Sequence, residues 1–276
     1  MLIISLLGGM GNQLFQYAAA RAVSIRTGMD LKLDITEFED YNLRKYELNN
    51  FNIQENFASV NEIVWLIKRK RLFQKNYFKE KRGKFLPEVL RIKNSAYLEG
   101  YFQSEKYFKD IKNVIRQELT FKNLDFIQNK NILNEILQEN SVSINIRCGE
   151  YINNPEVARV HNVCTMKYYQ NSIKYIQERV ENPVFYVFSD DIDWVVKNFK
   201  PNVNVTFVDT ANWQEDLYFM QNSKHNILAN SSFSWWGGWL NQNPEKIIIA
   251  PNKWFSDCSK LNYKSVVPRD WVKISV

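Results

Sequence analysis

The chain has 276 residues, of which 45% are hydrophobic, and it carries 36 basic and 30 acidic residues. This length and composition predict a globular protein with a real core, built as one large domain or two of ordinary size. Three cysteines without close pairing (Cys148, Cys164, Cys258) and only two histidines argue against a disulfide framework and a structural metal site, and favour a reducing compartment. No apolar segment approaches the ~20 residues needed to span a bilayer, so a soluble, cytoplasmic protein is expected.

The first half of the chain predicts a β-α-β start, typical of an α/β sheet, followed by mainly helical sequence. Short apolar runs indicate buried strands, and apolar positions at helical spacing indicate helices. Gly28 is placed to end the first helix. We expect strands over 1–7, 31–35 and 97–102, and helices over 12–27, 57–84, 108–119 and 131–139.

One basic segment dominates the charge distribution. Nine basic residues lie between 68 and 84, opposed there only by Glu80 and interleaved with aromatic residues. A solvated helix face, an anionic membrane surface and nucleic-acid binding all fit such a composition. Because the excess is local and no nucleic-acid motif accompanies it, nucleic acid is the weakest of the three. Peripheral contact with the inner membrane face through Lys68–Lys84 stays open.

The second half alternates strand and helix patterns, which predicts a mostly parallel, doubly wound sheet. We expect strands over 141–147, 184–189, 203–208, 226–229 and 246–250, and helices over 167–180, 193–198, 214–221 and 235–240. The chain is therefore predicted to be an α/β protein of two halves, 1–135 and 136–276. Ligands bind beyond the carboxyl ends of parallel strands, and four polar motifs lie at such ends.

The first motif, residues 8–13 (Gly-Gly-Met-Gly-Asn-Gln), joins the first predicted strand to the first helix. Its glycines let backbone N–H groups approach a ligand, and the amides of Asn12 and Gln13 suit a sugar hydroxyl or phosphate oxygen. Asn12 alone would also serve as a helix N-cap. A dinucleotide fingerprint is broken at Leu14, which disfavours a dehydrogenase even though Asp34 lies at a suitable spacing for a ribose contact.

The most informative motif is the serine- and tryptophan-rich stretch from Ala229 to Leu240. A strand-to-helix corner of this kind directs hydroxyl and backbone N–H donors to one point at a helix N-terminus, which suits a phosphate. The alternative is that the serines compete for an N-cap and the tryptophans pack the core. The clustering favours a ligand site.

The other two motifs are residues 145–150 (Asn-Ile-Arg-Cys-Gly-Glu) and Ser189-Asp190-Asp191. Arg147 can hold an anionic group by two hydrogen bonds, or form an ion pair with Glu150 or Asp190. The two aspartates suit a ribose or guanine edge, and Asp190 could equally cap the next helix. Donors for a diphosphate and acceptors for a nucleoside together predict a nucleotide-sugar transferase that stabilises its leaving group without a metal.

These residues resemble the bacterial α-1,2-fucosyltransferases of glycosyltransferase family 11. The resemblance rests on several blocks that span the chain: 8–17, 98–103, 188–191, 224–236 and 244–251. It implies a GT-B-like fold, with two Rossmann-like α/β halves and a cleft between them. It also implies metal-independent, inverting transfer of L-fucose from GDP-β-L-fucose to the 2-hydroxyl of a galactoside, with no cofactor.

The resemblance also implies roles for individual residues. Arg147 would hold the β-phosphate, Asp191 the guanine, and Ser231 and Ser232 the diphosphate, with Asn12 near the transferred sugar. The catalytic candidates are Arg147, Asn12 and Glu150. The predicted donor-binding residues are Gly9, Gly11, Asn12, Gln13, Asn145, Arg147, Ser189, Asp190, Asp191, Asn230, Ser231, Ser232 and Phe233.

One block departs from the family. Where the family usually has His-x-Arg-Arg-Gly-Asp, this chain has Asn145, Arg147, Cys148 and Glu150, so only the first arginine is kept. Three hypotheses follow: a fucosyltransferase acting on surface polysaccharide or oligosaccharide, a transferase of the same fold with another nucleotide sugar, and a glycan- or nucleotide-binding homologue with impaired catalysis. The acceptor is expected to meet residues 38–60 and 151–166.

Overall fold

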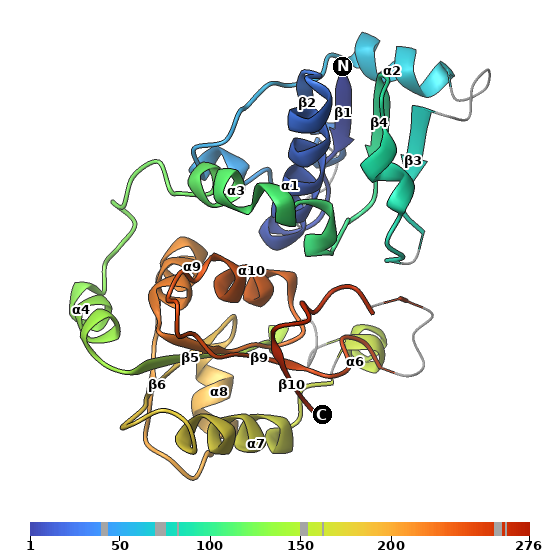
Figure 1. Ribbon diagram of the computed structural model, residues 1–276. Coiled ribbons are helices and arrows are strands. Elements are labelled where there is room, and N and C mark those ends of the chain that lie inside the picture. Colours follow the sequence, from blue (N-terminus) through green and yellow to red (C-terminus); the bar gives the residue numbers. More distant parts are fainter. Residues whose placement is uncertain are drawn as a thin grey trace. The chain divides into compact units, whose positions relative to one another are not determined.

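The computed structural model describes residues 1–39, 44–69, 76–81, 83–149, 154–161, 163–256, 261–262 and 264–276 (Figure 1). The chain forms two compact units. Unit 1 comprises Met1–Asn123 and Leu261–Pro268, and unit 2 comprises Leu124–Lys260 and Arg269–Val276. The predicted division after residue 135 lies within helix α4 (Lys130–Gln138), which packs against elements of unit 2. The observed division precedes this helix, because its apolar face is buried in the second core.

Unit 1 is built on a parallel four-stranded sheet in the order β2-β1-β4-β3. Helix α1 packs against β1 and β2, and helix α2 packs against β4. Gly28, with φ of 69°, ends α1 in the left-handed conformation that glycine adopts without strain. The strands are β1 (Leu2–Ser5), β2 (Leu31–Asp34), β3 (Tyr77–Lys79) and β4 (Ala96–Glu99), and the α-helices are α1 (Met10–Thr27), α2 (Val60–Arg69) and α3 (Lys112–Glu118). The 3-10 turns are η1 (Thr36–Phe38), η2 (Leu48–Asn50), η4 (Pro87–Arg91), η5 (Glu105–Tyr107) and η6 (Lys109–Ile111).

Unit 2 is built on a parallel six-stranded sheet in the order β10-β9-β8-β5-β6-β7. The strands are β5 (Ser141–Ile146), β6 (Val184–Ser189), β7 (Val205–Phe207), β8 (His225–Ile227), β9 (Ile248–Pro251) and β10 (Val272–Ile274). Besides α4, the helices are α6 (Pro155–His161), α7 (Met166–Gln177), α8 (Ile192–Asn198), α9 (Trp213–Asn222) and α10 (Ser232–Leu240).

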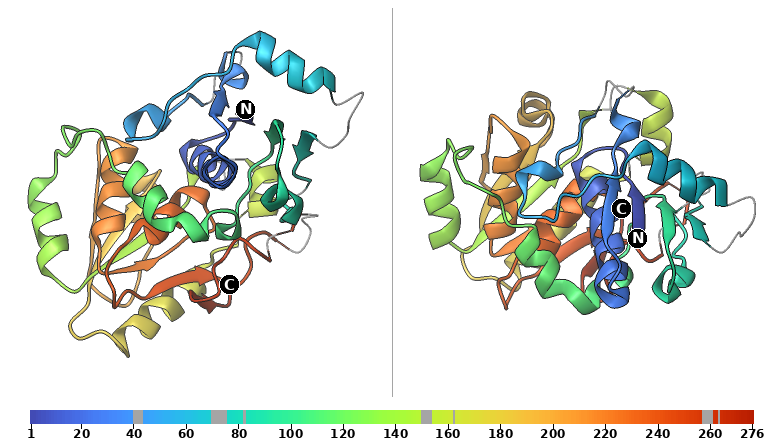
Figure 2. Two further views of the ribbon diagram at one scale, coloured as in Figure 1. Left: turned by 45° about the horizontal axis from the view of Figure 1, so that its top comes forward. Right: turned by 90° about the horizontal axis from the view of Figure 1, so that it is seen from above.

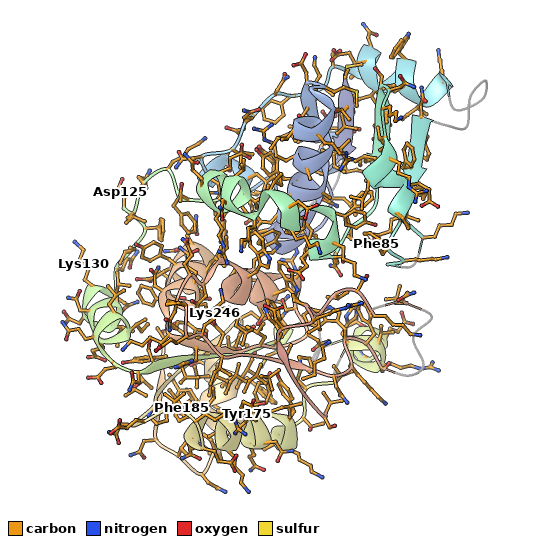
Figure 3. All side chains as sticks on the ribbon, in the orientation of Figure 1. Phe85, Asp125, Lys130, Tyr175, Phe185 and Lys246 are labelled. Atoms are coloured by element: carbon orange, nitrogen blue, oxygen red, sulfur yellow. The ribbon has the colours of Figure 1, made fainter. Side chains whose placement is uncertain are left out.

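Helices cover both faces of the unit 2 sheet, with α7 and α8 on one face and α9 and α10 on the other (Figures 1 and 2). Alternate residues of the central strands serve the two cores. Val142 and Ile144 of β5 pack toward α7, where Phe185 and Tyr175 also meet (Figure 3). Tyr186 of β6 packs toward α9. A parallel strand that is buried on both faces explains the continuous apolar runs in the sequence.

Most predicted elements are confirmed to within a few residues, with five exceptions. The helix predicted over 57–84 is wrong in its second part, because α2 ends at Arg69 and residues 77–79 pair with β4 as an edge strand. The helix predicted over 108–119 begins as the 3-10 turn η6. The helix predicted from Trp235 begins at Ser232. Helix α6 and strand β10 were not predicted.

Candidate active site

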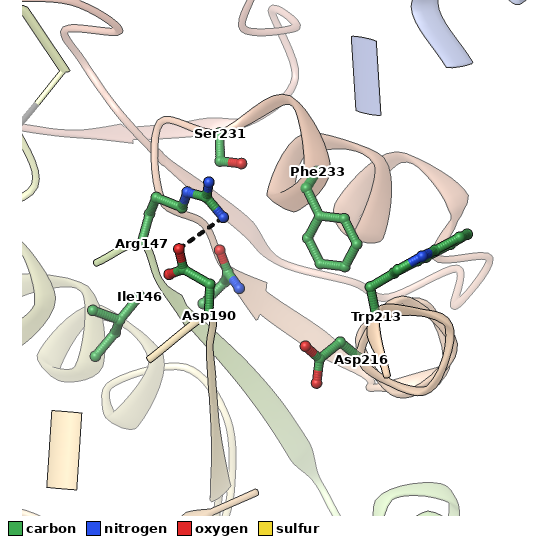
Figure 4. A pocket seen from close by; sticks show the side chains of 8 residues that line it. Ile146, Arg147, Asp190, Trp213, Asp216, Ser231 and Phe233 are labelled. Carbon is green, nitrogen blue, oxygen red and sulfur yellow. Dashed lines mark ion pairs between the residues drawn. The ribbon is translucent and has the colours of Figure 1, made fainter. Parts of the chain in front are cut away.

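A pocket of about 100 Å³ opens at the carboxyl edge of the unit 2 sheet (Figure 4). Its walls come from the ends of the neighbouring strands β5 and β6, from the β8–α10 corner and from α9. It is lined by Asn145, Ile146, Arg147, Asp190, Trp213, Asp216, Ser231 and Phe233. Three of the four predicted strand-end motifs therefore meet here, at the position where open parallel sheets bind ligands.

Arg147 is held in this pocket by an ion pair. Its Nη1 lies 2.9 Å from Oδ2 of Asp190, and both side chains are about a quarter exposed, at 26% and 25% (Figure 4). The other carboxylate oxygen of Asp190 accepts from the backbone N–H of Cys148 at 2.8 Å. The ion pair that the sequence allowed is thus present. Since a guanidinium carries five N–H donors, a pair with one carboxylate is compatible with binding a second anion.

Gly149 makes this arrangement possible. A Cβ atom at Gly149 would lie 2.3 Å from Oδ2 of Asp190, so no side chain fits there while Asp190 stays paired with Arg147. Replacing Gly149 with Ala is expected to displace Asp190 and to lower transfer activity about tenfold or more. The stability of the folded protein should change little. Comparing kcat/KM of Gly149→Ala in the wild-type and Asp190→Ala backgrounds checks this. The glycine substitution should have almost no further effect once Asp190 is truncated, and equal losses in both backgrounds would contradict the steric explanation.

The β8–α10 corner offers hydrogen-bond donors to the same pocket. Ser231 is the N-cap residue of α10, yet its side chain makes no capping bond to that helix. The neighbouring hydroxyl of Ser234 accepts from the backbone N–H of Ala229, which fixes the corner. The first turn of a helix presents backbone N–H groups and partial positive charge. A phosphate bound beside Ser231 would therefore meet both.

The tryptophans of this motif have a structural role. Trp235 and Trp236 are fully buried, and Trp239 is 6% exposed. Their rings contact one another, and Trp235 also contacts Trp271 near the end of the chain. The core-packing interpretation is confirmed for these indoles. Of the residues of this motif, Ser231 and Phe233 line the pocket.

Asp216 is a pocket residue that the sequence analysis missed. Its Oδ1 accepts from the hydroxyl of Thr210 at 2.6 Å. Burial, reinforced by the charges of Glu215, Asp190 and Asp209, raises the pKa of Asp216 to about 7. The adjacent Glu215 is fully buried and accepts from the backbone N–H groups of Gln128 and Asn129, so it anchors the chain before α4. Acids are ordinary in the first turn of a helix, so the sequence pattern around Asp216 does not distinguish a pocket residue from a helix-stabilising one.

Ser189 and Asp191 are engaged in local structure and do not line the pocket. Asp191 accepts from the backbone N–H of Trp194 and caps α8, so the cap suggested for Asp190 is made by its neighbour. The Ser189 hydroxyl accepts from the backbone N–H of Asp191 and faces the sulfur of Cys148 at 3.6 Å. Cys148 is buried, and burial raises the pKa of its thiol to about 11, so it is neutral at physiological pH.

Asn230 and Ser232 stand on either side of Ser231. The Asn230 amide donates to the carbonyl oxygens of His161 and Trp254, which ties α6 and a distant loop to the corner. Ser232, in the first turn of α10, is half-buried. A direct contact of Ser189, Asp191, Asn230 or Ser232 with a donor stays a prediction.

The glycine-rich turn lies in unit 1. Gly8 has φ of 78°, and a Cβ atom there would lie 2.8 Å from Nδ2 of Asn12, so both conformation and space require glycine. Gly9 is the N-cap of α1, so Asn12 is inside the helix rather than its cap. Asn12 is half-buried, and its Oδ1 accepts from the Gln103 side chain at 2.8 Å. Asn12 is thus fixed in orientation.

Gln13, by contrast, is fully buried. Its amide donates to the carbonyl oxygens of Gly8 and Lys45 and accepts from the backbone N–H of Glu47, so it joins the turn to the following loop. Gly11 is also buried in α1. Whether these turn residues contact a donor stays a prediction.

Asp34, considered for a ribose contact, is a buried structural acid. It accepts from the hydroxyl of Tyr97 at 2.5 Å and from the backbone N–H of Thr36 at 3.0 Å.

Glu150 and parts of the predicted acceptor loops (40–43, 151–153 and 162) lie outside the described residues. Within the described ranges, no three His, Cys, Asp or Glu side chains are grouped so as to hold a metal ion. Among the helices of that same part of the chain, none is long and apolar enough to cross a membrane.

Comparison with known proteins agrees with this geometry. The profile of glycosyl transferase family 11 matches residues 1–275. An alpha-1,2-colitosyltransferase of Escherichia coli is 36% identical over 99% of this chain and 98% of its own length. The O-antigen biosynthesis glycosyltransferase WbnK of Escherichia coli is 33% identical over 97% and 98%.

Solved structures show the fold. A variant of Arabidopsis thaliana FUT1 in complex with GDP aligns with a TM-score of 0.53 at 8% identity, covering 90% of this chain and 70% of that one. POFUT1 in complex with GDP-fucose aligns with a TM-score of 0.51 at 11% identity, covering 90% and 97%. The predicted GT-B-like α/β fold is confirmed. With its profile match over almost the entire length, the chain belongs to glycosyl transferase family 11.

Proposed function

We propose that this chain transfers L-fucose from GDP-β-L-fucose to the 2-hydroxyl of a galactoside during synthesis of a surface glycan, with inversion and without a metal ion. The observation that carries the proposal is the pocket where Arg147, fixed by Asp190, lies with Ser231 at the N-terminus of α10. The relatives named for α-1,2 transfer and for O-antigen synthesis support the linkage and the kind of glycan.

Breaking the bond between fucose and the diphosphate leaves negative charge on the β-phosphate while the sugar gains oxocarbenium character. The Arg147 guanidinium and the donors of the α10 corner are fixed before the reaction, so they can stabilise that charge without reorganising. A preorganised cation and helix N-terminus together supply what a divalent metal would supply. The acceptor hydroxyl attacks C1 from the face opposite the departing diphosphate, which inverts the configuration and releases GDP and the proton of the hydroxyl.

Asp216 fits the nucleoside end of the donor better than the diphosphate end, because a carboxylate repels phosphate. In its charged form it would accept from the N–H groups of a guanine edge. The resemblance places the guanine on Asp191, but Asp191 caps α8 whereas Asp216 lines the pocket. We therefore assign base recognition to Asp216, with Trp213 as the adjacent apolar wall.

A second donor, GDP-colitose, is favoured by one observation. The 36% identical relative is named for colitosyl transfer. Colitose is L-fucose without its 3-hydroxyl, so the two donors share the nucleotide and differ only at that position. The departure at Cys148 from the usual family block does not distinguish them, because Cys148 is buried and neutral.

Thermal unfolding and initial rates with GDP-L-fucose, GDP-colitose, GDP-mannose and UDP-galactose, in the presence of EDTA, test the proposal. At a hundred times its Kd, the true donor should stabilise the folded protein by about 2.7 kcal/mol and raise Tm by several degrees. We expect GDP-L-fucose to do so and to support transfer to lactose despite the chelator. Turnover of GDP-colitose alone would establish the second candidate, and stabilisation by UDP-galactose alone would refute both. Binding without turnover on any galactoside would identify a catalytically impaired homologue.

A further inference from the structure

Helix α2 carries more apolar surface than unit 1 can bury. Ile63 and Leu66 pack against the sheet, where they are 8% and 0% exposed. Val60, Val64 and Ile67 are 66%, 38% and 37% exposed. These three positions are spaced i, i+4 and i+7, so they form one stripe along the helix, adjacent to its buried face.

The exposed apolar residues concentrate around this stripe. Phe57, just before α2, is 46% exposed, and Trp65 within it is 45% exposed. Of the eleven large hydrophobic residues that are exposed in the described part of the chain, five lie between 57 and 67. Single exposed apolar residues are ordinary on a protein surface, whereas a contiguous group marks an interaction site.

Basic residues adjoin the stripe. Lys68 in the last turn of α2 is exposed. Exposed Lys79, which forms an ion pair with Glu99, lies on β3, whose Tyr77 packs in the same cluster as Ile63 and Leu66. Between residues 57 and 84 the sequence has nine basic and two acidic residues, a net charge of +7. Because the whole chain has a net charge of +6, the remainder carries about −1, so the net positive charge of the chain comes from this segment.

We propose that this surface, formed by Phe57, Val60, Val64, Trp65, Ile67 and Lys68, docks on an anionic lipid bilayer with α2 parallel to the membrane plane. Helix α2 is an outer element of unit 1, which leaves the stripe accessible (Figures 1 and 2). Its aliphatic side chains would enter the headgroup–acyl boundary, where the indole of Trp65 is also favoured. The cations would meet the lipid phosphates.

The combination of groups selects a membrane over a nucleic acid. A nucleic-acid groove combines cations with aromatic rings on which bases stack. Here three of the five exposed apolar side chains are aliphatic, and Val60, the most exposed of them, has no ring to offer. Charge and apolar area act together at a lipid surface, so binding should require both.

Flotation of the full-length protein with vesicles tests the proposal. Vesicles of phosphatidylcholine with 30% phosphatidylglycerol are compared with pure phosphatidylcholine, at low and high salt. We expect binding only to the anionic vesicles, and weakening by salt. Lys68→Gln should weaken binding about fivefold, since one cation near the surface contributes roughly 1 kcal/mol. Val64→Ser/Ile67→Ser should also weaken it.

Matched controls come from unit 2. Lys167→Gln/Lys174→Gln removes two exposed charges from α7, and Leu137→Ser removes an exposed apolar side chain from α4. Both should bind like the wild type, and all variants should transfer sugar to a soluble acceptor normally. Quenching of Trp65 by brominated lipid, lost in Trp65→Phe, would place the indole in the membrane. Equal binding to neutral vesicles, unchanged binding of the α2 variants, or binding to an RNA oligonucleotide in place of vesicles would overturn the proposal.

Discussion

Replacing Arg147 with Ala is expected to lower kcat/KM for sugar transfer by about 10³-fold or more and to weaken GDP binding. Arg147 is the cation that the ion pair with Asp190 fixes at the pocket. Removing one preorganised donor to a developing anion commonly lowers kcat by about 10²- to 10³-fold, and here a full charge is lost as well. Initial rates with saturating acceptor and a thermal shift with GDP measure the two effects.

Two conservative variants separate charge from geometry. Arg147→Lys keeps the charge but loses the planar fork, so we expect it to bind GDP while remaining at least tenfold slower. Asp190→Asn keeps Arg147 but removes its anionic partner and should give an intermediate loss, because the guanidinium is then less well fixed. Both side chains of the pair are about a quarter exposed, so unfolding of the variants is not expected. Wild-type GDP binding by Arg147→Ala would refute the site assignment.

The sequence predicted the central strands of the sheets better than the edge strand β3. The alternation in Val142–Ile146 and the apolar run Phe185–Phe188 predicted strands, and both segments are buried on both faces of the sheet. The edge strand β3 lacked such a signal, because Tyr77 and Phe78 are only half-buried and follow a basic, helix-like stretch. Pairing with β4 decided its conformation, and that pairing is a tertiary effect.

The site was predicted in part for a similar reason. Arg147 and Ser231 stand where strands end, and strand ends can be located from the sequence. The partner of each polar group cannot be located in this way. Asp190 and Asp191 are equivalent in the sequence, yet one pairs with Arg147 and the other caps α8. Glu215 and Asp216 are equally similar, yet only Asp216 faces the pocket.

Asp216→Asn is the second substitution with a large expected effect. Burial raises the pKa of Asp216 to about 7, so in the free protein the carboxyl is mostly neutral at pH 6 and mostly charged at pH 8. If the carboxylate accepts from guanine N–H groups, KM for the GDP-sugar should fall as pH rises through 7. Losing a hydrogen bond to a charged group removes about 10- to 100-fold in kcat/KM at pH 8. The KM of the variant should then be independent of pH in this range.

The substitution Asp216→Asn should lower activity but raise the free energy of unfolding at pH 8. This combination distinguishes a functional acid from a structural one. A carboxyl whose pKa is raised by folding binds its proton more tightly in the folded state, so the free energy of unfolding falls as pH rises from about 4 to 7. Asp216→Asn cannot ionise and should escape that fall, becoming more stable than the wild type at pH 8 although the bond from Thr210 must adapt. The buried neighbour Glu215 is the matched control, because Glu215→Gln should lose stability through the backbone N–H groups of Gln128 and Asn129. If Asp216→Asn is more stable and less active than the wild type, the carboxylate lowers the stability of the free protein and contributes to ligand binding. Unchanged KM and an unchanged pH profile would show that the carboxylate does not meet the donor.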